Sequence, residues 1–184
     1  MRASKSALLA PVFALALGAL CFLVPGDADA KLAGSGGSAT FHAHASPGDL
    51  SIDGTTNDVS VADDGANVTV TAQLGNLSTG IGLRDRHTKK YLEVAKYGSA
   101  QLQVPRASLN FNGGSGDATG SLTIHNTTKP STFHYTATKQ GSSFSVKATT
   151  KILLTDYGIE VPSYMGVTVK NEVNLEVSFT AVDS

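Results

Sequence analysis

The side chains with the greatest chemical potential in this chain of 184 residues are concentrated between residues 79 and 97. The segment contains five of the chain's 14 lysines and arginines, together with Asp85 and His87. Its cations are Arg84, Arg86, Lys89, Lys90 and Lys96. Such a cluster can meet solvent or the polar head group of a ligand, and an imidazole such as that of His87 can transfer a proton near neutral pH.

No other pattern in the sequence specifies catalytic or metal chemistry. His42 and His44 are two residues apart, so they share one face of a strand and could hold a metal with a third ligand. Histidines on the polar face of a strand are far more often solvated than ligating. Residues 53–58 resemble a calcium loop in composition but not in ligand spacing, so we interpret them as a hairpin turn. We therefore expect no metal site and no cofactor.

Strands must position these residues, because most of the remaining chain alternates apolar and polar side chains with a period of two. The longest runs span residues 144–154 and 167–181. Strands of this length would project beyond a flat sandwich, whereas a coiled sheet that closes on itself has no exposed edge. The sequence therefore predicts an all-β fold, a closed antiparallel barrel of about eight strands. The alternation changes phase at Pro105 and Arg106, which predicts a bulge or strand corner.

Small residues occupy many positions in phase with the apolar face of these strands. They are Ala43, Ala72, Ala100, Ala107, Ala118, Gly120, Ala137 and Ala148. A barrel of about eight strands is just wide enough to be filled by side chains or by one small ligand. Alanine and glycine leave volume unfilled, which packed interiors do not tolerate without cost. Two interpretations remain open: an apolar guest enters the barrel, or the small residues lie at tight strand crossings.

The cationic segment breaks the strand pattern and has the spacing of a short helix. Leu83, His87 and Tyr91 follow one another at intervals of four residues, and Arg86 and Lys90 form a parallel cationic row. One interpretation is a helix over the barrel mouth with its apolar side inward. The other is a solvated helix whose Asp85 pairs with Arg84, Arg86 or Lys89.

Four blocks of the sequence, in order, carry a family resemblance. The first spans residues 79–87 and continues with 91–93 and 96–97; the others span 120–125 with 128–130, 154–159 and 164–167. The series closely resembles the YceI-like family of polyisoprenoid-binding proteins. Two departures occur near the mouth: Gly98 stands where the family commonly has proline, and Asn126 where it commonly has glycine. Asparagine tolerates a positive φ, so the second turn should survive.

The resemblance implies a lipocalin-like barrel with a helical insertion and a long apolar tunnel for the tail of an isoprenoid quinone or related lipid. For the tunnel mouth we predict Arg84, His87, Tyr97, Asp156 and Tyr157. For the tunnel lining we predict Leu74, Leu77, Ile81, Leu92, Leu102, Phe111, Leu122, Ile124, Phe133, Phe144, Ile152, Met165 and Val177. The resemblance also implies export, often to the periplasm, and a possible homodimer.

The predicted function is non-catalytic binding of an isoprenoid lipid or quinone, for carriage or storage. An alternative is an isomerase or cyclase of the same fold that uses His87 or Tyr157 as acid or base on an apolar substrate. A membrane-embedded barrel is disfavoured because the chain has only 7 Phe, 5 Tyr and no Trp for aromatic girdles. The net charge of −1 argues against a nucleic-acid partner.

The chain begins with a predicted signal peptide, residues 1–30, which places the mature protein in the periplasm or outside the cell. A short basic start precedes an apolar run, and a small-x-small pattern ends at Ala30. An uncleaved anchor is the alternative. Residues 31–38 are predicted to be a flexible lead-in and 39–184 the barrel domain. The single cysteine, Cys21, lies in the leader, so the mature chain can form no disulfide.

Overall fold

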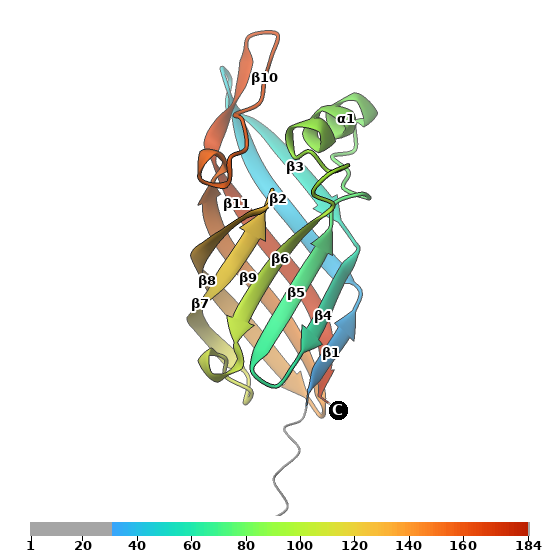
Figure 1. The fold of residues 1–184 in the computed structure, drawn as a ribbon, viewed down its shortest axis with the longest axis vertical. Coiled ribbons are helices and arrows are strands. Elements are labelled where there is room, and N and C mark those ends of the chain that lie inside the picture. Colours follow the sequence, from blue (N-terminus) through green and yellow to red (C-terminus); the bar gives the residue numbers. More distant parts are fainter. Residues whose placement is uncertain (1–30, 184) are drawn as a thin grey trace, which may run out of the picture.

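The computed structural model describes residues 31–183, which form one tall β-barrel with a helix at its upper end (Figure 1). The predicted signal peptide lies outside the described residues. No helix within residues 31–183 has the length and apolar character needed to cross a membrane.

Eleven strands, one α-helix and two short 3-10 helices make up this part of the chain. The strands are β1 (Leu32–Ser35), β2 (Gly37–Ser46), β3 (Leu50–Thr56), β4 (Val59–Asp63), β5 (Asn67–Gln73), β6 (Ser99–Pro105), β7 (Gly114–Ile124), β8 (Thr127–Gln140), β9 (Ser143–Leu153), β10 (Ser163–Tyr164) and β11 (Val167–Asp183). The helices are α1 (Gly82–Tyr91), η1 (Arg106–Ser108) and η2 (Leu154–Tyr157).

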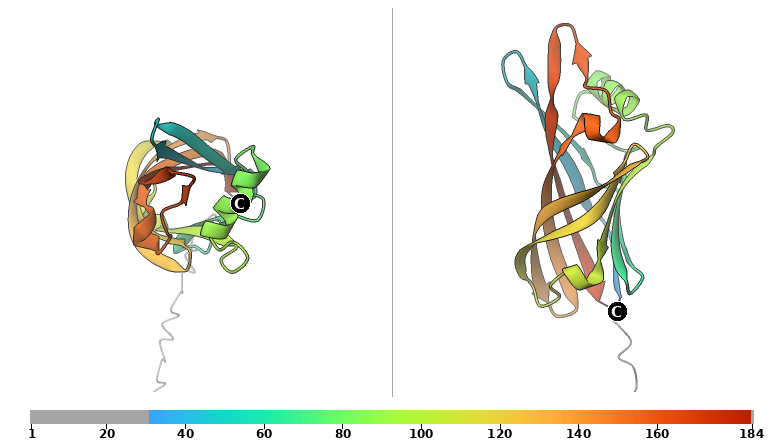
Figure 2. Two further views of the ribbon diagram at one scale, coloured as in Figure 1. Left: turned by 90° about the horizontal axis from the view of Figure 1, so that it is seen from above. Right: turned by 60° about the vertical axis from the view of Figure 1, so that its left-hand side comes forward.

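The sheet closes on itself within the described residues. Its hydrogen-bonded order runs β1-β4-β5-β6-β7-β8-β9-β11, and β11 pairs back with β1. All pairings are antiparallel, so the predicted closed barrel of eight strands is confirmed. Strand β2 pairs with β11 and β3 pairs with β2, and together they extend the wall upward. Figure 2 shows that their hairpin and the β10–β11 hairpin project beyond the barrel.

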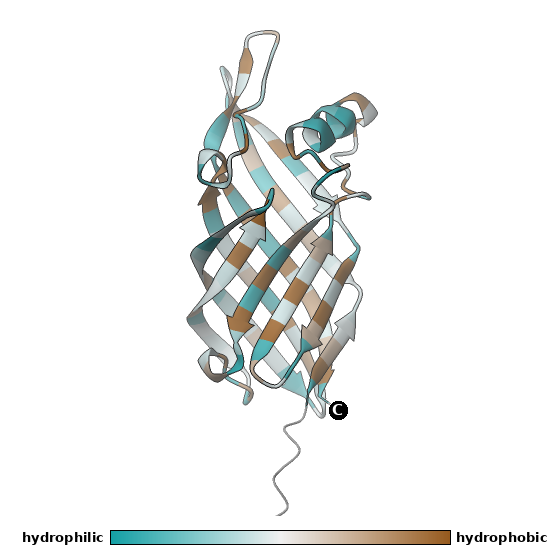
Figure 3. Cartoon of the chain, in the orientation of Figure 1, coloured by the Kyte–Doolittle hydropathy of each residue, from teal (hydrophilic) through white to brown (hydrophobic). Residues whose placement is uncertain are grey.

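The period-two pattern sets which face of each strand is buried. In β4, Val59, Val61 and Asp63 are buried while Ser60 and Ala62 are exposed. The same alternation runs through β8, where Phe133 and Tyr135 point inward. Apolar and polar stripes therefore alternate along the strands in Figure 3. The barrel interior consequently receives almost entirely apolar side chains.

The first strand of the described residues, β1, forms part of the barrel wall. Strand β1 falls within residues 31–38, and Ala33 pairs with both Ala62 of β4 and Val182 of β11. A Cβ atom added to Gly34 would lie 2.5 Å from the carbonyl oxygen of Thr180, so a small residue is needed for this approach. This segment is therefore an ordered strand that closes the ring, in place of the predicted flexible lead-in.

The phase change predicted at Pro105 marks the end of a strand. Strand β6 ends at Pro105, and η1 follows directly. The backbone N–H of Arg106 donates to the carbonyl of Ala66 at 2.8 Å, which holds this corner against the neighbouring turn. Arg106 also forms an ion pair with the buried Asp63 at the narrow end of the barrel.

Candidate functional site

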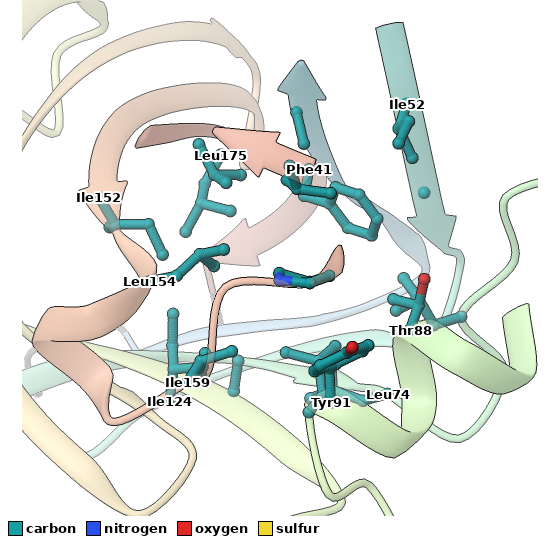
Figure 4. Close-up of a pocket in the computed structure, with 18 of the residues that line it drawn as sticks. Phe41, Ile52, Leu74, Thr88, Tyr91, Ile124, Ile152, Leu154, Ile159 and Leu175 are labelled. Atoms are coloured by element: carbon teal, nitrogen blue, oxygen red, sulfur yellow. The ribbon is translucent and has the colours of Figure 1, made fainter. Parts of the chain in front are cut away.

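A large cavity occupies the upper part of the barrel and opens where the helix and the two long hairpins meet. Its volume is about 1010 Å³, and nearly all of its lining is apolar. The close-up in Figure 4 shows side chains from opposite walls pointing into one space, among them Phe41, Ile152 and Tyr91. A void of this size within a close-packed protein is far larger than the gaps that ordinary packing leaves.

Most residues predicted for the tunnel lining border this cavity. They are Leu74, Leu77, Ile81, Leu92, Leu102, Leu122, Ile124, Phe133, Ile152, Met165 and Val177. Phe111 and Phe144 lie elsewhere, in the lining of a second cavity of about 70 Å³. Their rings meet edge to face, with centroids 6.2 Å apart, toward the narrow end.

The two cavities are separated by a waist. Both are lined by Val70, Leu102, Phe133, Ala148 and Val177. Phe133 is only 5 % exposed and its ring centroid lies 6.2 Å from that of Tyr135. The main cavity is therefore open at the mouth and narrows at a floor formed by these five side chains.

Five of the eight small residues singled out from the sequence fall into two groups, whereas Ala118 and Ala137 are packed in the core and Ala107 is exposed in η1. Ala43, Ala72, Ala100 and Ala148 border the main cavity, so their missing side-chain volume contributes to the void. Gly120 instead lies at a tight strand crossing, since an added Cβ would be 2.6 Å from the carbonyl oxygen of Gln103. Both interpretations of the small residues therefore hold, at different positions.

Helix α1 covers the open end and turns its apolar stripe toward the cavity. Residues 74–98 leave the wall between β5 and β6, which carries the helix to the mouth (Figure 1). Leu83, His87 and Tyr91, the stripe predicted from the sequence, all border the cavity. The Tyr91 hydroxyl lies 3.4 Å from the carbonyl oxygen of Ser163, so the helix also meets the β10–β11 hairpin.

The carboxylate of Asp85 ties the start of the helix to the preceding loop. It accepts hydrogen bonds from the backbone N–H of Thr79 at 2.6 Å, the Thr79 hydroxyl at 2.5 Å and the Ser78 hydroxyl at 3.1 Å. Among residues 31–183, Asp85 lies within ion-pair distance of none of Arg84, Arg86 and Lys89, although the charge of Lys89 adds a smaller stabilisation of its carboxylate. The hydrogen bonds from Thr79 hold the pKa of the Asp85 carboxyl below its usual value, because they stabilise the charged form.

We expect Asp85→Asn to loosen the helical insertion at neutral pH. Folding lowers the pKa of Asp85, so the ionised carboxylate stabilises the folded insertion. This stabilisation is fully present above the unfolded-state pKa of about 3.9, and it is lost as the pH falls through the lower pKa of the folded state. Limited proteolysis at residues 79–97 should therefore rise several-fold in the variant at pH 7. The same cleavage should appear in the unaltered protein only in acid. The control is Asp117→Asn, which changes an exposed carboxylate on β7. Equal resistance of the two variants to proteolysis would contradict the role of Asp85 in holding the helical insertion.

The residues predicted for the mouth are only partly brought together. Arg84 and His87 border the cavity, and Arg84 Nη2 donates to the carbonyl of Thr79 at 2.6 Å. The His87 ring packs against Tyr164 with centroids 5.2 Å apart. Tyr97, Asp156 and Tyr157 are not among the lining residues.

Each of these three residues has another environment. Tyr97 packs edge-on against His125 with ring centroids 4.7 Å apart, and Asp156 lies 3.9 Å from the ammonium of Lys129. Tyr157 is 3 % exposed within an apolar cluster, and this burial raises the pKa of its phenol.

The family model of the YceI-like domain matches residues 31–181. This chain belongs to the YceI-like family. The resemblance seen in the four sequence blocks is thereby confirmed.

Among curated relatives of this YceI-like chain, a UPF0312 protein of Pseudomonas fluorescens SBW25 is 35 % identical over 103 residues. That alignment covers 50 % of this chain and 52 % of the relative, so the chain spans about half the length of this relative. A UPF0312 protein of Pseudomonas syringae pv. syringae B728a is 29 % identical over 138 residues, covering 71 % and 69 %.

Solved structures share the YceI-like fold at low sequence identity. A polyisoprenoid binding domain from Saccharophagus degradans superposes with a TM-score of 0.67 at 14 % identity, covering 85 % of this chain and 99 % of that domain. BcnA of Burkholderia cenocepacia gives a TM-score of 0.62 at 16 % identity, covering 78 % and 96 %. At such identities these likenesses show the fold alone.

A polar contact that sequence reasoning missed braces the mouth of this YceI-like barrel. His125 borders the cavity, and its Nε2 lies 2.6 Å from Glu93 Oε2 while its Nδ1 lies 3.2 Å from the carbonyl oxygen of Tyr157. The contact joins the helical insertion to the β7–β8 turn and η2. The only sequence signal was the place of His125 at the end of block 120–125.

The histidines considered for a metal have separate carboxylate partners. His42 Nδ1 lies 2.8 Å from Asp53, and His44 Nδ1 lies 3.5 Å from Asp49. Within residues 31–183, no cluster of three His, Cys, Asp or Glu has an arrangement that could hold a metal ion.

Proposed function

We propose that this protein binds the tail of an isoprenoid lipid or quinone in its barrel cavity, outside the cytoplasm, and carries or stores it without catalysis and without another cofactor. The observation that carries the proposal is the apolar cavity of about 1010 Å³, open at the helix-covered end and floored by the waist at Phe133. Family membership supports it, because a structural neighbour is named a polyisoprenoid binding domain. Export, the quinone head group and a homodimer remain predictions.

The energetics favour an elongated apolar ligand. Burial of each methylene-sized group recovers about 0.8 kcal/mol, so one five-carbon unit offers a few kcal/mol before ordering costs. The tunnel needs only shape and apolarity to capture this free energy. A reactive side chain is not required for binding.

The alternative of an isomerase or cyclase gains no support from the site. Tyr157, one of its two proposed acid–base residues, lies in the packed cluster beside the cavity, and burial raises its pKa above the value usual for tyrosine. A phenol of this kind does not exchange protons readily near neutral pH. His87 is packed against Tyr164 at the mouth, where the apolar tail would pass.

Native purification tests the binding proposal. The full chain is expressed with its leader in a bacterium, recovered from the periplasmic fraction, and extracted with organic solvent for mass spectrometry. We expect about one isoprenoid lipid per protein molecule and an N-terminus at Lys31. A protein that carries no such lipid and binds none when several chain lengths are added would contradict the function. An intact leader would contradict the predicted cleavage and leave the binding result to be judged separately.

A further inference from the structure

Exposed apolar side chains gather at the tunnel mouth. Three segments that are far apart in the sequence contribute to an apolar rim, which we define as Leu50, Ile81, Leu83, Tyr164 and Met165. Their exposed fractions range from 48 % for Leu83 to 85 % for Met165, although large apolar residues normally avoid water. Within residues 31–183 only Leu153 and Val182 are other large apolar residues of comparable exposure.

The rim is continuous with the interior of the barrel. All five of its residues also border the main cavity. They come from the β2–β3 hairpin, the start of α1 and the β10–β11 hairpin, which surround the open end in Figure 2. The apolar rim therefore continues into the mainly apolar lining of the cavity.

Four cations of helix α1 stand beside this rim, and two of them, Arg84 and Lys89, donate to the backbone carbonyls of Thr79 and Gly75 at 2.6 Å each. Helix α1 carries Arg84, Arg86, Lys89 and Lys90 but only one acid, Asp85, whose carboxylate is engaged by Thr79 and Ser78. The ion pairs of residues 31–183 involve other lysines and arginines, among them Arg106, Lys129, Lys147, Lys151 and Lys170. Arg86 and Lys90 are exposed, so their charges face solvent.

Acids also lie at this end of the barrel. Asp49, at the tip of the β2–β3 hairpin, pairs with Lys170 at 2.8 Å, and Glu93 contacts His125 at 2.6 Å. Glu93 and Glu160 are exposed at the cavity border and oppose the helix charge. The mouth thus combines protruding apolar side chains with a net positive helix, the pairing that binds an anionic lipid surface.

We propose that the apolar rim and α1 dock the barrel, mouth down, on the surface of an anionic lipid bilayer. The rim side chains enter the boundary between head groups and acyl chains, while Arg86 and Lys90 face the anionic head groups. This rests on the proposed function and adds its route of loading: an isoprenoid tail moves from bilayer to tunnel along a continuous apolar path. Passage through water would expose every methylene of the tail, at a cost that grows with its length.

Vesicle flotation tests the docking. Purified protein is mixed with one of two kinds of vesicle. The neutral vesicles contain phosphatidylcholine alone, and the anionic vesicles contain phosphatidylcholine with about 30 mol % phosphatidylglycerol of the same acyl-chain length. We expect partitioning onto the anionic vesicles at least about tenfold above that onto neutral ones, weakening as salt is raised. The double variant Leu83→Ser/Met165→Ser should lose about tenfold or more of this binding on both vesicles. Arg86→Glu/Lys90→Glu should lose the preference for anionic vesicles.

The matched control uses the same chemistry away from the rim. Leu153→Ser/Val182→Ser removes two exposed apolar side chains from the outer wall, so its partitioning should equal that of the unaltered protein. All variants keep the same N-terminus, so a contribution from the leader cancels. Equal losses in the control and rim variants, or no binding to anionic vesicles, would overturn the proposal. A rim variant that changes only from dimer to monomer would also overturn it, by assigning the rim to a second copy of the chain.

Tail binding is measured in parallel, so that the two proposals fail separately. A three-unit isoprenoid alcohol, soluble enough to be titrated without vesicles, is added to the unaltered protein and to the rim variant. If both bind the alcohol but neither docks on vesicles, the tunnel function stands and the docking proposal falls. If the protein binds to vesicles but does not bind the alcohol, the docking proposal stands and the lipid-carrying function falls.

Discussion

Replacement of Ala100 by tryptophan should abolish binding of a long isoprenoid tail while leaving the barrel folded. Ala100 lies on β6 opposite Ala72 of β5, and both border the main cavity below the helix. An indole at this position projects into the void, because the strand fixes the direction of its Cβ. The tail loses the room that the indole takes, and exclusion of even one five-carbon unit forfeits about 4 kcal/mol of gross burial free energy. We expect affinity to fall at least about a hundredfold.

The matched control for this variant is Gln103→Trp. Gln103 lies on the same strand but is exposed on the outer face, where an indole meets solvent and leaves the tunnel unchanged. Tail affinity is measured by titration with isoprenoid alcohols of two or more lengths, and folding by urea unfolding. Unchanged tail affinity in a folded Ala100→Trp protein would show that the ligand binds outside the cavity. Equal losses in both variants would point to a general disturbance of β6.

The architecture was predictable because its signals are local and repeated. The long alternations of residues 144–154 and 167–181 correspond to β9 and β11, whose length requires a coiled, closed sheet. The helix over residues 82–91 followed from the spacing of Leu83, His87 and Tyr91, since only a helix places these side chains on one face. The corner at Pro105 followed from the lost N–H donor of proline.

The level of each residue along the barrel axis was not predictable. The period-two alternation predicts whether a side chain faces into or out of the barrel, but not its height along the axis. Inward side chains near the narrow end pack against one another, whereas those near the mouth line the cavity. Phe111 and Phe144 have the pattern of tunnel residues and yet belong to the packed end. The environment of Tyr157 depends on how η2 folds back over the sheet, which brings it against residues distant in the sequence.

The strand β1 was missed for a related reason. Its glycine-rich composition is typical of a flexible linker, because glycine lowers the propensity for any regular structure. The small residues are needed here, since Gly34 approaches the backbone of β11 too closely for a side chain. Pairing with β4 and β11 supplies the order that the segment lacks on its own.

The closure of the ring at β1 depends on one buried carboxylate, so Asp63→Asn should strongly destabilise the barrel. The side chain of Asp63 is 0 % exposed and pairs with the guanidinium of Arg106, itself 17 % exposed. It also accepts hydrogen bonds from the backbone N–H of Leu32 at 3.2 Å and of Gly65 at 2.8 Å. Loss of one partner of a buried ion pair leaves an uncompensated charge, which costs about 3–5 kcal/mol. Urea unfolding at neutral pH should show a decrease of this size in the free energy of unfolding.

Two further variants separate the buried pair from ordinary surface charge. Lys151→Met breaks an exposed ion pair with Glu172 and should change the free energy of unfolding by less than about 1 kcal/mol. Asp63→Asn/Arg106→Met removes both charges, so it should be more stable than Asp63→Asn alone if the unpaired guanidinium is the source of the loss. The guanidinium of Arg106 also lies over the ring of Phe111, 4.3 Å from its centroid. Because Arg106→Met removes this contact too, the double variant should not regain the full free energy of unfolding. Because this ion pair lies at the end opposite the mouth, any folded Asp63→Asn protein should keep its affinity for the isoprenoid tail. A loss of tail affinity with unchanged stability would mean that the narrow end shapes the tunnel as well as closing the ring.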